Sequence, residues 1–139
     1  MKIRYLIVAI SITSVFLLPL GCGLFDGGGS SGGLGPLGPV IVPYQDDSFT
    51  VEPFSKMTIT INMRAGAVLE GYLTVRGGND DIRFYIEDSY GTMLLDKNRV
   101  QGRFDFSFTA STAGFHTMFF DNSFSWITSK QVFIHYRVR

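Results

Sequence analysis

Oxygen-bearing side chains clustered between two apolar stretches are the first place where this sequence could do chemistry. Residues 77–82 read GGNDDI, so Asn79, Asp80 and Asp81 offer hard oxygen ligands of the kind that calcium prefers. A calcium site needs about six to eight oxygens, which three adjacent residues do not supply alone. Gly-Gly-Asn-Asp is also favourable for a tight turn. We therefore expect a turn here, with calcium binding as the alternative, and we expect no cofactor.

The usual catalytic side chains are sparse. His116 and His135 are the only histidines, and neither has a His or Cys partner at a metal-ligand spacing, so we expect surface or strand-edge roles for both. No Gly-x-Ser-x-Gly nucleophile elbow is present, and no Gly-rich phosphate loop precedes a helix. The acidic residues are too scattered to name a glycosidase pair. The sequence therefore predicts a protein that is not an enzyme.

The single cysteine, Cys22, stands at the end of an N-terminal targeting pattern. Lys2 and Arg4 precede an apolar run over residues 5–20, which is shorter than the roughly 20 residues that a bilayer-spanning helix needs. The sequence LLPLGC resembles a bacterial lipobox, in which a peptidase cuts before a cysteine that carries diacylglycerol. We therefore predict a lipoprotein signal peptide over residues 1–21 and lipidation of Cys22. An ordinary signal peptide or an uncleaved anchor is the alternative.

A segment with few core-forming side chains follows the cysteine. Residues 27–39, GGGSSGGLGPLGP, predict a flexible tether with a root-mean-square reach of roughly 20 Å. Residues 40–44 are either a short edge segment or the end of this tether. We therefore assign residues 22–44 to the lipidated cysteine and tether, and residues 45–139 to one folded domain.

Composition and charge narrow the class of partner. The chain has 139 residues, of which 45% are hydrophobic and 14% aromatic, enough to build a core. Twelve basic and twelve acidic residues give a formal net charge of zero, and removing Lys2 and Arg4 with the leader leaves 10 against 12, or about −2. No basic patch stands out, so nucleic acid is not an expected partner. One cysteine excludes a disulfide within the chain.

The folded part is dominated by alternation of apolar and polar residues, the period of a half-buried strand. RFDFSFTA is the clearest segment, with Phe104, Phe106 and Phe108 on one face. The other alternating segments are KMTITINM, VLEGYLTV, DIRFYIED and KQVFIHYRVR. FHTMFF is apolar on both faces and predicts a central strand, and Gly, Asn and Asp mark the turns between segments. We predict an all-β antiparallel β-sandwich of six to eight strands, with a closed barrel as the alternative.

Three aromatic residues fall on the strand face opposite the inferred core. They are Tyr72, Tyr85 and Phe133. Exposed apolar patches often mark interaction sites, so we treat these side chains as candidate ligand or partner contacts.

The segment DNSFSWITSK, residues 121–130, holds the only tryptophan. We expect Phe124 and Trp126 to fold back over the open end of the sandwich, so that Trp126→Ala costs roughly 3–5 kcal/mol. Asp121, Asn122, Ser123 and Ser125 are expected to bond unpaired backbone groups. The predicted fold-closing residues are Asp121, Asn122, Phe124, Ser125, Trp126 and Lys130. The alternative is a recognition loop on the surface.

Three segments in a fixed order carry a resemblance to a known family. They are GAVLEGYLTVRGGNDDIRFYIEDSYGTML, GRFDFSFTASTAGFHTMFFDNSFSWITSK and VFIHYRV. With its Phe-x-Phe strand, Gly-initiated strand and Asn-x-x-Ser…Lys segment, the region over about residues 49–138 resembles the GOLD (Golgi dynamics) domain. That domain is the lumenal β-sandwich of eukaryotic cargo receptors in the early secretory pathway. The resemblance implies a sandwich that binds other proteins, or itself, on the outer side of a membrane.

The departures from that family limit what carries over. Eukaryotic members commonly have a disulfide whose position falls at Phe119 here, so the resemblance implies that aromatic packing replaces the crosslink. Their coiled coil, membrane helix and sorting tail have no counterpart before Arg139, and we do not expect coat binding or vesicle sorting.

Three functions remain open from the sequence. The first is a prokaryotic extracytoplasmic lipoprotein whose sandwich is a protein-interaction module, bound to the membrane through lipid and to an unidentified protein or a second copy. The second is a carbohydrate- or small-ligand-binding sandwich, which an exposed coplanar pair among Tyr72, Tyr85, Trp126 and Phe133 would favour. The third is a hydrolase with paired carboxylates or a Ser–His pair in a pocket.

Overall fold

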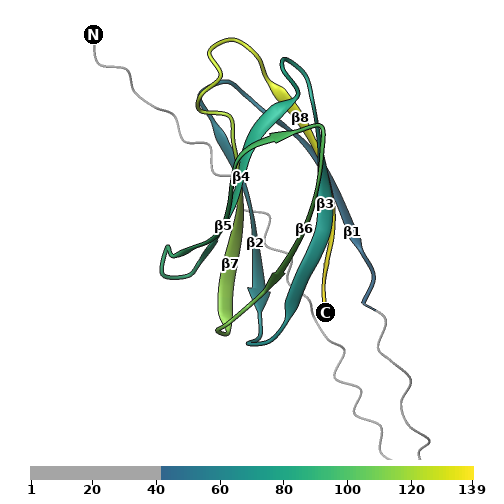
Figure 1. Ribbon diagram of the computed structural model, residues 1–139, viewed down its shortest axis with the longest axis vertical. Coiled ribbons are helices and arrows are strands. Elements are labelled where there is room, and N and C mark those ends of the chain that lie inside the picture. Colours follow the sequence, from purple (N-terminus) through teal and green to yellow (C-terminus); the bar gives the residue numbers. More distant parts are fainter. Residues whose placement is uncertain (1–41) are drawn as a thin grey trace, which may run out of the picture.

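The computed structural model describes residues 42–139 and arranges them as eight strands (Figure 1). The strands are β1 (Gln45–Val51), β2 (Lys56–Met63), β3 (Val68–Arg76), β4 (Asp81–Asp88), β5 (Met93–Gln101), β6 (Arg103–Thr109), β7 (Gly114–Asp121) and β8 (Lys130–Val138). The predicted signal peptide, Cys22 and most of the predicted tether lie outside the described residues. Residues 42–139 contain no helix, and so none that is long and apolar enough to cross a membrane.

Two four-stranded antiparallel sheets face each other. Their strand orders are β1-β8-β3-β6 and β2-β7-β4-β5. The predicted sandwich is therefore confirmed over the alternative of a closed barrel, and β7 is central in its sheet, as FHTMFF predicts. All six segments that alternate or are apolar on both faces form strands.

Two strands, β1 and β5, were not predicted individually. Both lie at sheet edges, where only one neighbour must be paired and few apolar residues are needed. In β5 four consecutive polar residues, Asp96 to Arg99, interrupt any alternation, and its pairing with β4 shifts register twice. An edge strand with such irregularities has no periodic signal for sequence analysis to detect.

The inward rows of the two sheets meet in an aromatic core. The ring of Phe84 lies 5.3 Å from that of Phe120 and 5.2 Å from that of Phe106, centre to centre, and Phe49 reaches Phe120 at 5.0 Å. Fully burying a side chain of this size contributes roughly 1.5–3 kcal/mol. The two sheets are therefore joined by the packing of these buried aromatic side chains.

β3 and β8 approach each other closely at Gly71. A Cβ there would overlap the carbonyl oxygen of His135 and lie 2.8 Å from Cα of Tyr136, both of them backbone atoms. This close approach holds β3 and β8 in the register that places Tyr72 opposite His135.

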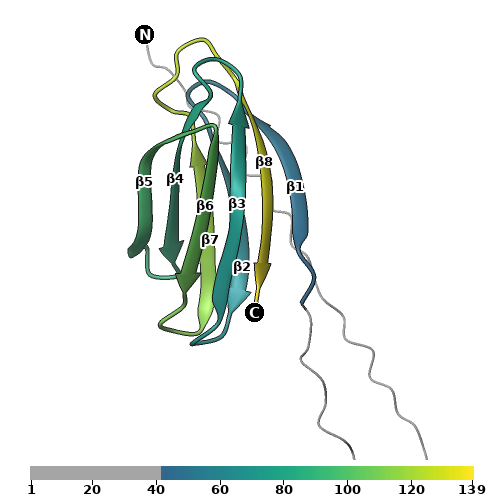
Figure 2. The same cartoon turned by 45° about the vertical axis from the view of Figure 1, so that its right-hand side comes forward.

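The two ends of the sandwich differ in their connections. At one end lie the start of β1 and the C-terminus, at the lower end of Figure 1. At the other lie the β1–β2 loop, the β3–β4 turn and the long β7–β8 loop, and the view turned by 45° shows the same arrangement (Figure 2). We call this second end the loop end.

Candidate functional site

An aromatic row crosses the outer face of the β1-β8-β3-β6 sheet. The ring of Tyr44 stacks on His135 at 4.2 Å with an interplanar angle of 14°, and the ring of Tyr72 lies 5.1 Å from that of His135, centre to centre. The Arg103 guanidinium lies 3.6 Å from the centre of the Tyr72 ring. Asp46, opposite His135 in the register, bonds its Nδ1 at 2.6 Å. These residues meet because neighbouring strands place them side by side.

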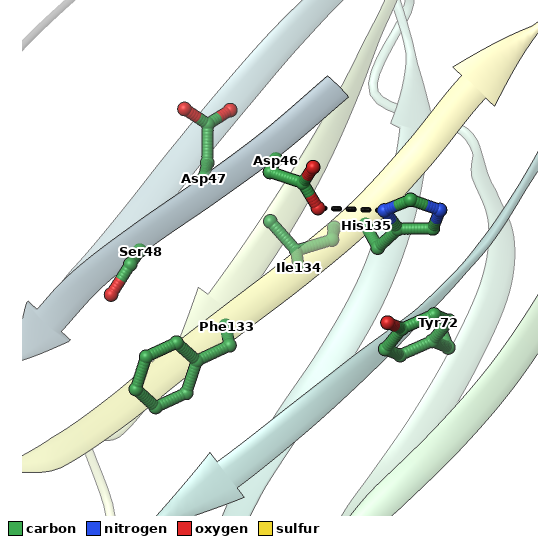
Figure 3. Close-up of a pocket in the computed structure, with 7 residues that line it drawn as sticks. All are labelled: Asp46, Asp47, Ser48, Tyr72, Phe133, Ile134 and His135. Atoms are coloured by element: carbon green, nitrogen blue, oxygen red, sulfur yellow. Dashed lines mark hydrogen bonds and ion pairs between the residues drawn. The ribbon is translucent and has the colours of Figure 1, made fainter. Parts of the chain in front are cut away.

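A shallow depression lies beside the aromatic row (Figure 3). Its lining residues are Asp46, Asp47, Ser48, Tyr72, Phe133, Ile134 and His135, and its volume is about 190 Å³. Phe133 is 39% exposed, and the Arg76 guanidinium lies 5.8 Å from its ring centre. Pockets that enclose small molecules typically measure about 300–1,000 Å³. The depression is therefore smaller than pockets that typically enclose a small molecule.

Charges on this face are largely neutralised by pairing. Hydrogen bonds from Arg137, and next from Arg139, lower the pKa of Glu70 below its ordinary value. On the inner side of the same sheet, burial, followed by the neighbouring Asp47 carboxylate, raises the pKa of the Tyr136 hydroxyl to about 12. The face therefore presents paired charges around exposed aromatic edges.

Polar side chains of the β7–β8 loop turn inward. Asn122 Nδ2 donates to the carbonyl of Val51 at 3.1 Å and to that of Thr128 at 2.9 Å, and its backbone N–H bonds the carbonyl of Ser55. The Ser125 hydroxyl donates to the Thr128 carbonyl at 2.9 Å and accepts the Thr128 N–H at 3.2 Å. Asn122 and Ser125 thus fasten this loop to itself and to the β1–β2 loop.

Asp121 ends β7 with a similar anchoring role. Its carboxylate accepts the backbone N–H of Ser123 at 2.8 Å and pairs with Lys56 Nζ at 3.1 Å. Burial opposes its charged form, but these bonds from Ser123 and Lys56 outweigh that effect and lower the pKa of Asp121.

A buried ion pair closes the core at the loop end. Lys130 and Asp81 are each 1% exposed, and their Nζ and Oδ1 atoms are 2.9 Å apart. Lys130 also donates to the Gly77 carbonyl at 3.3 Å, and Arg99 bonds the second oxygen of Asp81. Burial works against ionisation of Asp81, but the hydrogen bonds from Lys130 and Arg99 outweigh it and lower the pKa of Asp81.

The GGNDD segment is a turn. Asp80 bonds the backbone N–H of Gly77 through Oδ1 at 2.6 Å, its own N–H bonds the Gly77 carbonyl, and it adopts a positive φ of 52°. Asn79 is exposed, and Asp81 is engaged by two cations, so the three oxygen-bearing residues do not converge. Within residues 42–139 no three His, Cys, Asp or Glu side chains are placed to hold one metal ion.

Apolar side chains of the loop end project into solvent. Trp126 is 79% and Ile127 90% exposed, and Phe124 and Phe54 are also exposed. The rings of Phe54 and Trp126 meet edge to face at 5.7 Å. We call these four residues the apolar tip. The prediction that Phe124 and Trp126 cover the core is wrong, because the inward-turned polar side chains and the Lys130–Asp81 pair already occupy that place.

Comparison with known families gives the domain a classification. The sequence model of the emp24/gp25L/p24 family/GOLD matches residues 48–139, more than half of the chain. The chain belongs to the GOLD family. This family is a non-enzymatic, cargo-receptor-like domain on the extracytoplasmic side of membranes. No curated protein matches the chain in sequence.

Among solved structures, the chain is similar to PliG of Aeromonas hydrophila, a periplasmic lysozyme inhibitor of g-type lysozyme. The two are 10% identical, the match covers 69% of this chain and 86% of that chain, and the TM-score is 0.42.

The family segment Asn-x-x-Ser…Lys corresponds to Asn122, Ser125 and Lys130 of this GOLD domain. All three are buried and hydrogen-bonded, so the recognisable part of the segment is the polar part that closes the loop end. The aromatic residues between them, Phe124 and Trp126, are exposed.

The candidate contacts are not all on one surface. Tyr72 and Phe133 meet at the depression, whereas Tyr85 belongs to the other sheet and is buried. The expectation that Tyr85 is exposed is wrong, because Phe119, its cross-strand neighbour on β7, stacks on it at 4.6 Å and 4°. Lys56 also donates to the Tyr85 hydroxyl. This stack confirms the aromatic packing expected at Phe119.

The aromatic arrangement does not favour sugar binding. Among the described residues, no two of Tyr72, Tyr85, Trp126 and Phe133 form a stacked pair; Tyr72 is instead flanked by His135 and Arg103. The exposed coplanar pair that would favour a carbohydrate ligand is therefore not formed.

The two histidines have different surroundings. His135 lies on the outer face, as expected, but His116 is buried, which the sequence did not predict. Its position in β7 points it inward beside Phe108, where Nδ1 contacts the Gly114 carbonyl. Its Nε2 has no hydrogen-bond partner within the described part of the chain. The segment FHTMFF is apolar on both faces, so its sequence pattern does not indicate whether His116 points inward or outward.

Proposed function

We propose that this GOLD domain is a non-catalytic protein-interaction module, held by lipid at Cys22 on the extracytoplasmic side of a membrane. The observation that carries the interaction role is the broad outer face of the β1-β8-β3-β6 sheet, with Phe133 exposed beside the aromatic row. Protein interfaces are enriched in tyrosine, phenylalanine and arginine, and such residues are concentrated here. The depression's volume of about 190 Å³ favours a protein surface over an enclosed small ligand.

Pre-ordering supports the same role. Arg103 over Tyr72, Arg137 over Tyr44 at 4.5 Å, and the pairing with Glu70 hold long side chains in place before any partner arrives. Side chains that are already ordered lose less conformational entropy on binding. The partner is another protein or a second copy of this chain.

A direct experiment compares two exposed phenylalanines. The intact protein would be extracted from membranes with mild detergent and its associated proteins quantified for wild type, Phe133→Glu and Phe115→Glu. Phe115 is 59% exposed but lies on the other sheet, so it is the matched control. We expect a partner that is retained by wild type and Phe115→Glu and reduced at least about tenfold by Phe133→Glu, as for a contact worth about 1.4 kcal/mol. Equal recovery with all three proteins would contradict the proposed surface.

The anchoring part of the proposal rests on the LLPLGC junction and the Gly-rich segment after it. A diacylglycerol thioether supplies two acyl chains, enough for stable attachment where one chain is marginal. Mass spectrometry of membrane-extracted protein should find an acylated Cys22 as the first residue, and Cys22→Ser should be released or left unprocessed. An unmodified thiol on a soluble mature chain would refute lipid anchoring without affecting the interaction surface.

A further inference from the structure

The apolar tip is an exposed surface distinct from the outer sheet face. Its members come from two loops, with Phe54 in the β1–β2 loop and the remaining three in the β7–β8 loop at the top of Figure 1. Trp126 and Ile127 are adjacent and are the most exposed of the four. A cluster of large apolar side chains held in water indicates a surface that is covered in use.

Part of the backbone beneath the tip is already hydrogen-bonded. The N–H groups of Ser123, Ser125 and Thr128 bond Asp121 Oδ1, the Asn122 carbonyl and Ser125 Oγ, respectively. Hydrocarbon cannot satisfy a backbone polar group, and each unsatisfied group is costly there. A loop that bonds these three N–H groups itself and turns a tryptophan and an isoleucine outward suits the interface between headgroups and acyl chains.

Charge and shape around the tip favour a lipid surface over a protein groove. The Arg99 guanidinium lies 4.9 Å from the Phe124 ring centre, and Lys56 begins β2 at the loop end. Both side chains are about half exposed, and each pairs with a carboxylate, Arg99 with Asp81 and Lys56 with Asp121. Tryptophan is enriched at the membrane interface, and basic residues are attracted to anionic headgroups. Trp126 and Ile127 are 79% and 90% exposed, as insertion at the interface requires of its apolar side chains.

We propose that the apolar tip inserts into the interface between headgroups and acyl chains of a phospholipid bilayer. This inference rests on the proposed function, in which the lipid on Cys22 keeps the domain close to a bilayer. Tyr44 lies 22 positions after Cys22, which gives a Gly-rich segment a reach of roughly 26 Å. A strand of eight residues spans about the same length, roughly 26 Å. The domain can therefore turn so that its loop end meets the membrane that holds its anchor.

The experiment uses the sole tryptophan as a depth reporter. The full chain, extracted from membranes, would be reconstituted into phosphatidylcholine–phosphatidylglycerol vesicles with or without bromine on the acyl chains. We expect Trp126 emission to be blue-shifted, shielded from iodide and quenched at least about twofold by the brominated lipid. Ile127→Asp should remove most of this bromine quenching, because it places a charge at the most exposed position of the tip.

A second variant, with its only tryptophan at another position, tests which end of the domain faces the bilayer. In the double variant Trp126→Phe/Phe115→Trp the only tryptophan lies on β7 near the opposite end of the sandwich. Its emission should be quenched by iodide and unaffected by brominated lipid.

Four outcomes decide the proposal. It is overturned if Trp126 stays open to iodide in vesicles, or if both reporters are quenched equally by bromine. Shielding of Trp126 in native membranes but not in pure lipid vesicles would also overturn it, in favour of a protein at the tip. Mass spectrometry of Cys22 on the same sample separates the two proposals, because an unmodified cysteine with bromine-quenched Trp126 would refute the lipid anchor and support tip insertion.

Discussion

Aromatic side chains on the two sheets and aromatic side chains at the loop end differ in how far their neighbours cover them. On the two sheets, Tyr72 is covered by the Arg103 guanidinium and Tyr85 by the ring of Phe119. At the loop end, Trp126 projects into solvent next to Ile127. The difference comes from cross-strand neighbours, which every residue inside a sheet has and a loop residue lacks. An aromatic side chain on a strand is therefore covered where its neighbours are large; Phe133 stays exposed between the smaller cross-strand neighbours Ser48 and Thr74.

The two regions are also held together by different interactions. The sheet face depends on strand register and close packing between β3 and β8, whereas the loop end depends on buried hydrogen bonds and the Lys130–Asp81 pair. The expected loss in the free energy of unfolding is therefore largest for a substitution that disturbs strand register. It is smaller for one that removes a buried charge, smaller again for one that removes buried hydrogen bonds, and smallest for one on the exposed surface.

Gly71→Ala should be the most damaging single change. The new Cβ would collide with backbone atoms of His135 and Tyr136, which cannot rotate away, so β3 and β8 must separate. We expect a loss of at least about 4 kcal/mol in the free energy of unfolding, or failure to fold. Gly102→Ala is the control, because its φ is 63° with nothing within 4 Å of the added Cβ, and should cost only about 1–2 kcal/mol. Equal losses in denaturant unfolding would show that the close approach at Gly71 is unimportant.

Lys130→Met should be the most damaging change at the loop end. It leaves the buried Asp81 carboxylate with only the half-exposed Arg99 as a partner, at a cost of about 3 kcal/mol. The double variant Lys130→Met/Asp81→Leu removes both charges and should recover most of that loss. If chemical denaturation finds the double variant as unstable as the single one, packing of the Lys130 stem rather than the ion pair is responsible.

The same pair should make stability fall in acid. Burial opposes ionisation of Asp81, but hydrogen bonds from Lys130 and Arg99 prevail, so its folded pKa lies below the ordinary aspartate value near 4. Its contribution is therefore fully present above about pH 4 and is lost as the pH falls through the lowered folded value. Melting temperatures between neutral pH and acid should fall more steeply for wild type than for Asp81→Asn. Parallel curves would remove Asp81 as a source of the pH dependence.

Two substitutions within the β7–β8 loop should differ from each other. Asn122→Ala removes donors to the carbonyls of Val51 and Thr128, so we expect a loss of about 2 kcal/mol, about 1 for each bond. Trp126→Ala removes an exposed ring and should change stability by less than about 0.5 kcal/mol. This value replaces the larger cost that burial of Trp126 would have implied. If Trp126→Ala lowers the free energy of unfolding as much as Asn122→Ala does, Trp126 stabilises the fold and is not only a surface residue.

Much of the fold could be predicted because alternation records which side of a strand is buried. Phe104, Phe106 and Phe108, for instance, share the predicted inward face of β6. Sequence cannot record what covers the outward face, since that depends on register, and so the sequence does not predict that Tyr85 is buried under Phe119. β5 escaped prediction because an edge strand with two register shifts need not alternate.

The site was harder to predict than the fold for a related reason. Asp81 and Lys130 are 49 residues apart, so nothing local links them, and Asp81 was instead considered as a calcium ligand. In the β7–β8 loop the polar side chains are buried and the aromatic ones are exposed, the reverse of the usual expectation. The reason is that the loop backbone needs the polar side chains as hydrogen-bond partners.

The account's central claim is that the outer sheet face meets protein and the apolar tip meets lipid. A photoreactive phenylalanine analogue placed at residue 133 or at residue 126 of the full chain, then illuminated in native membranes, tests both halves at once. The account predicts a protein adduct, seen as a heavier band, from position 133 and a phospholipid adduct, seen by mass spectrometry, from position 126. The same class of adduct from both positions, or the two classes exchanged, would contradict it.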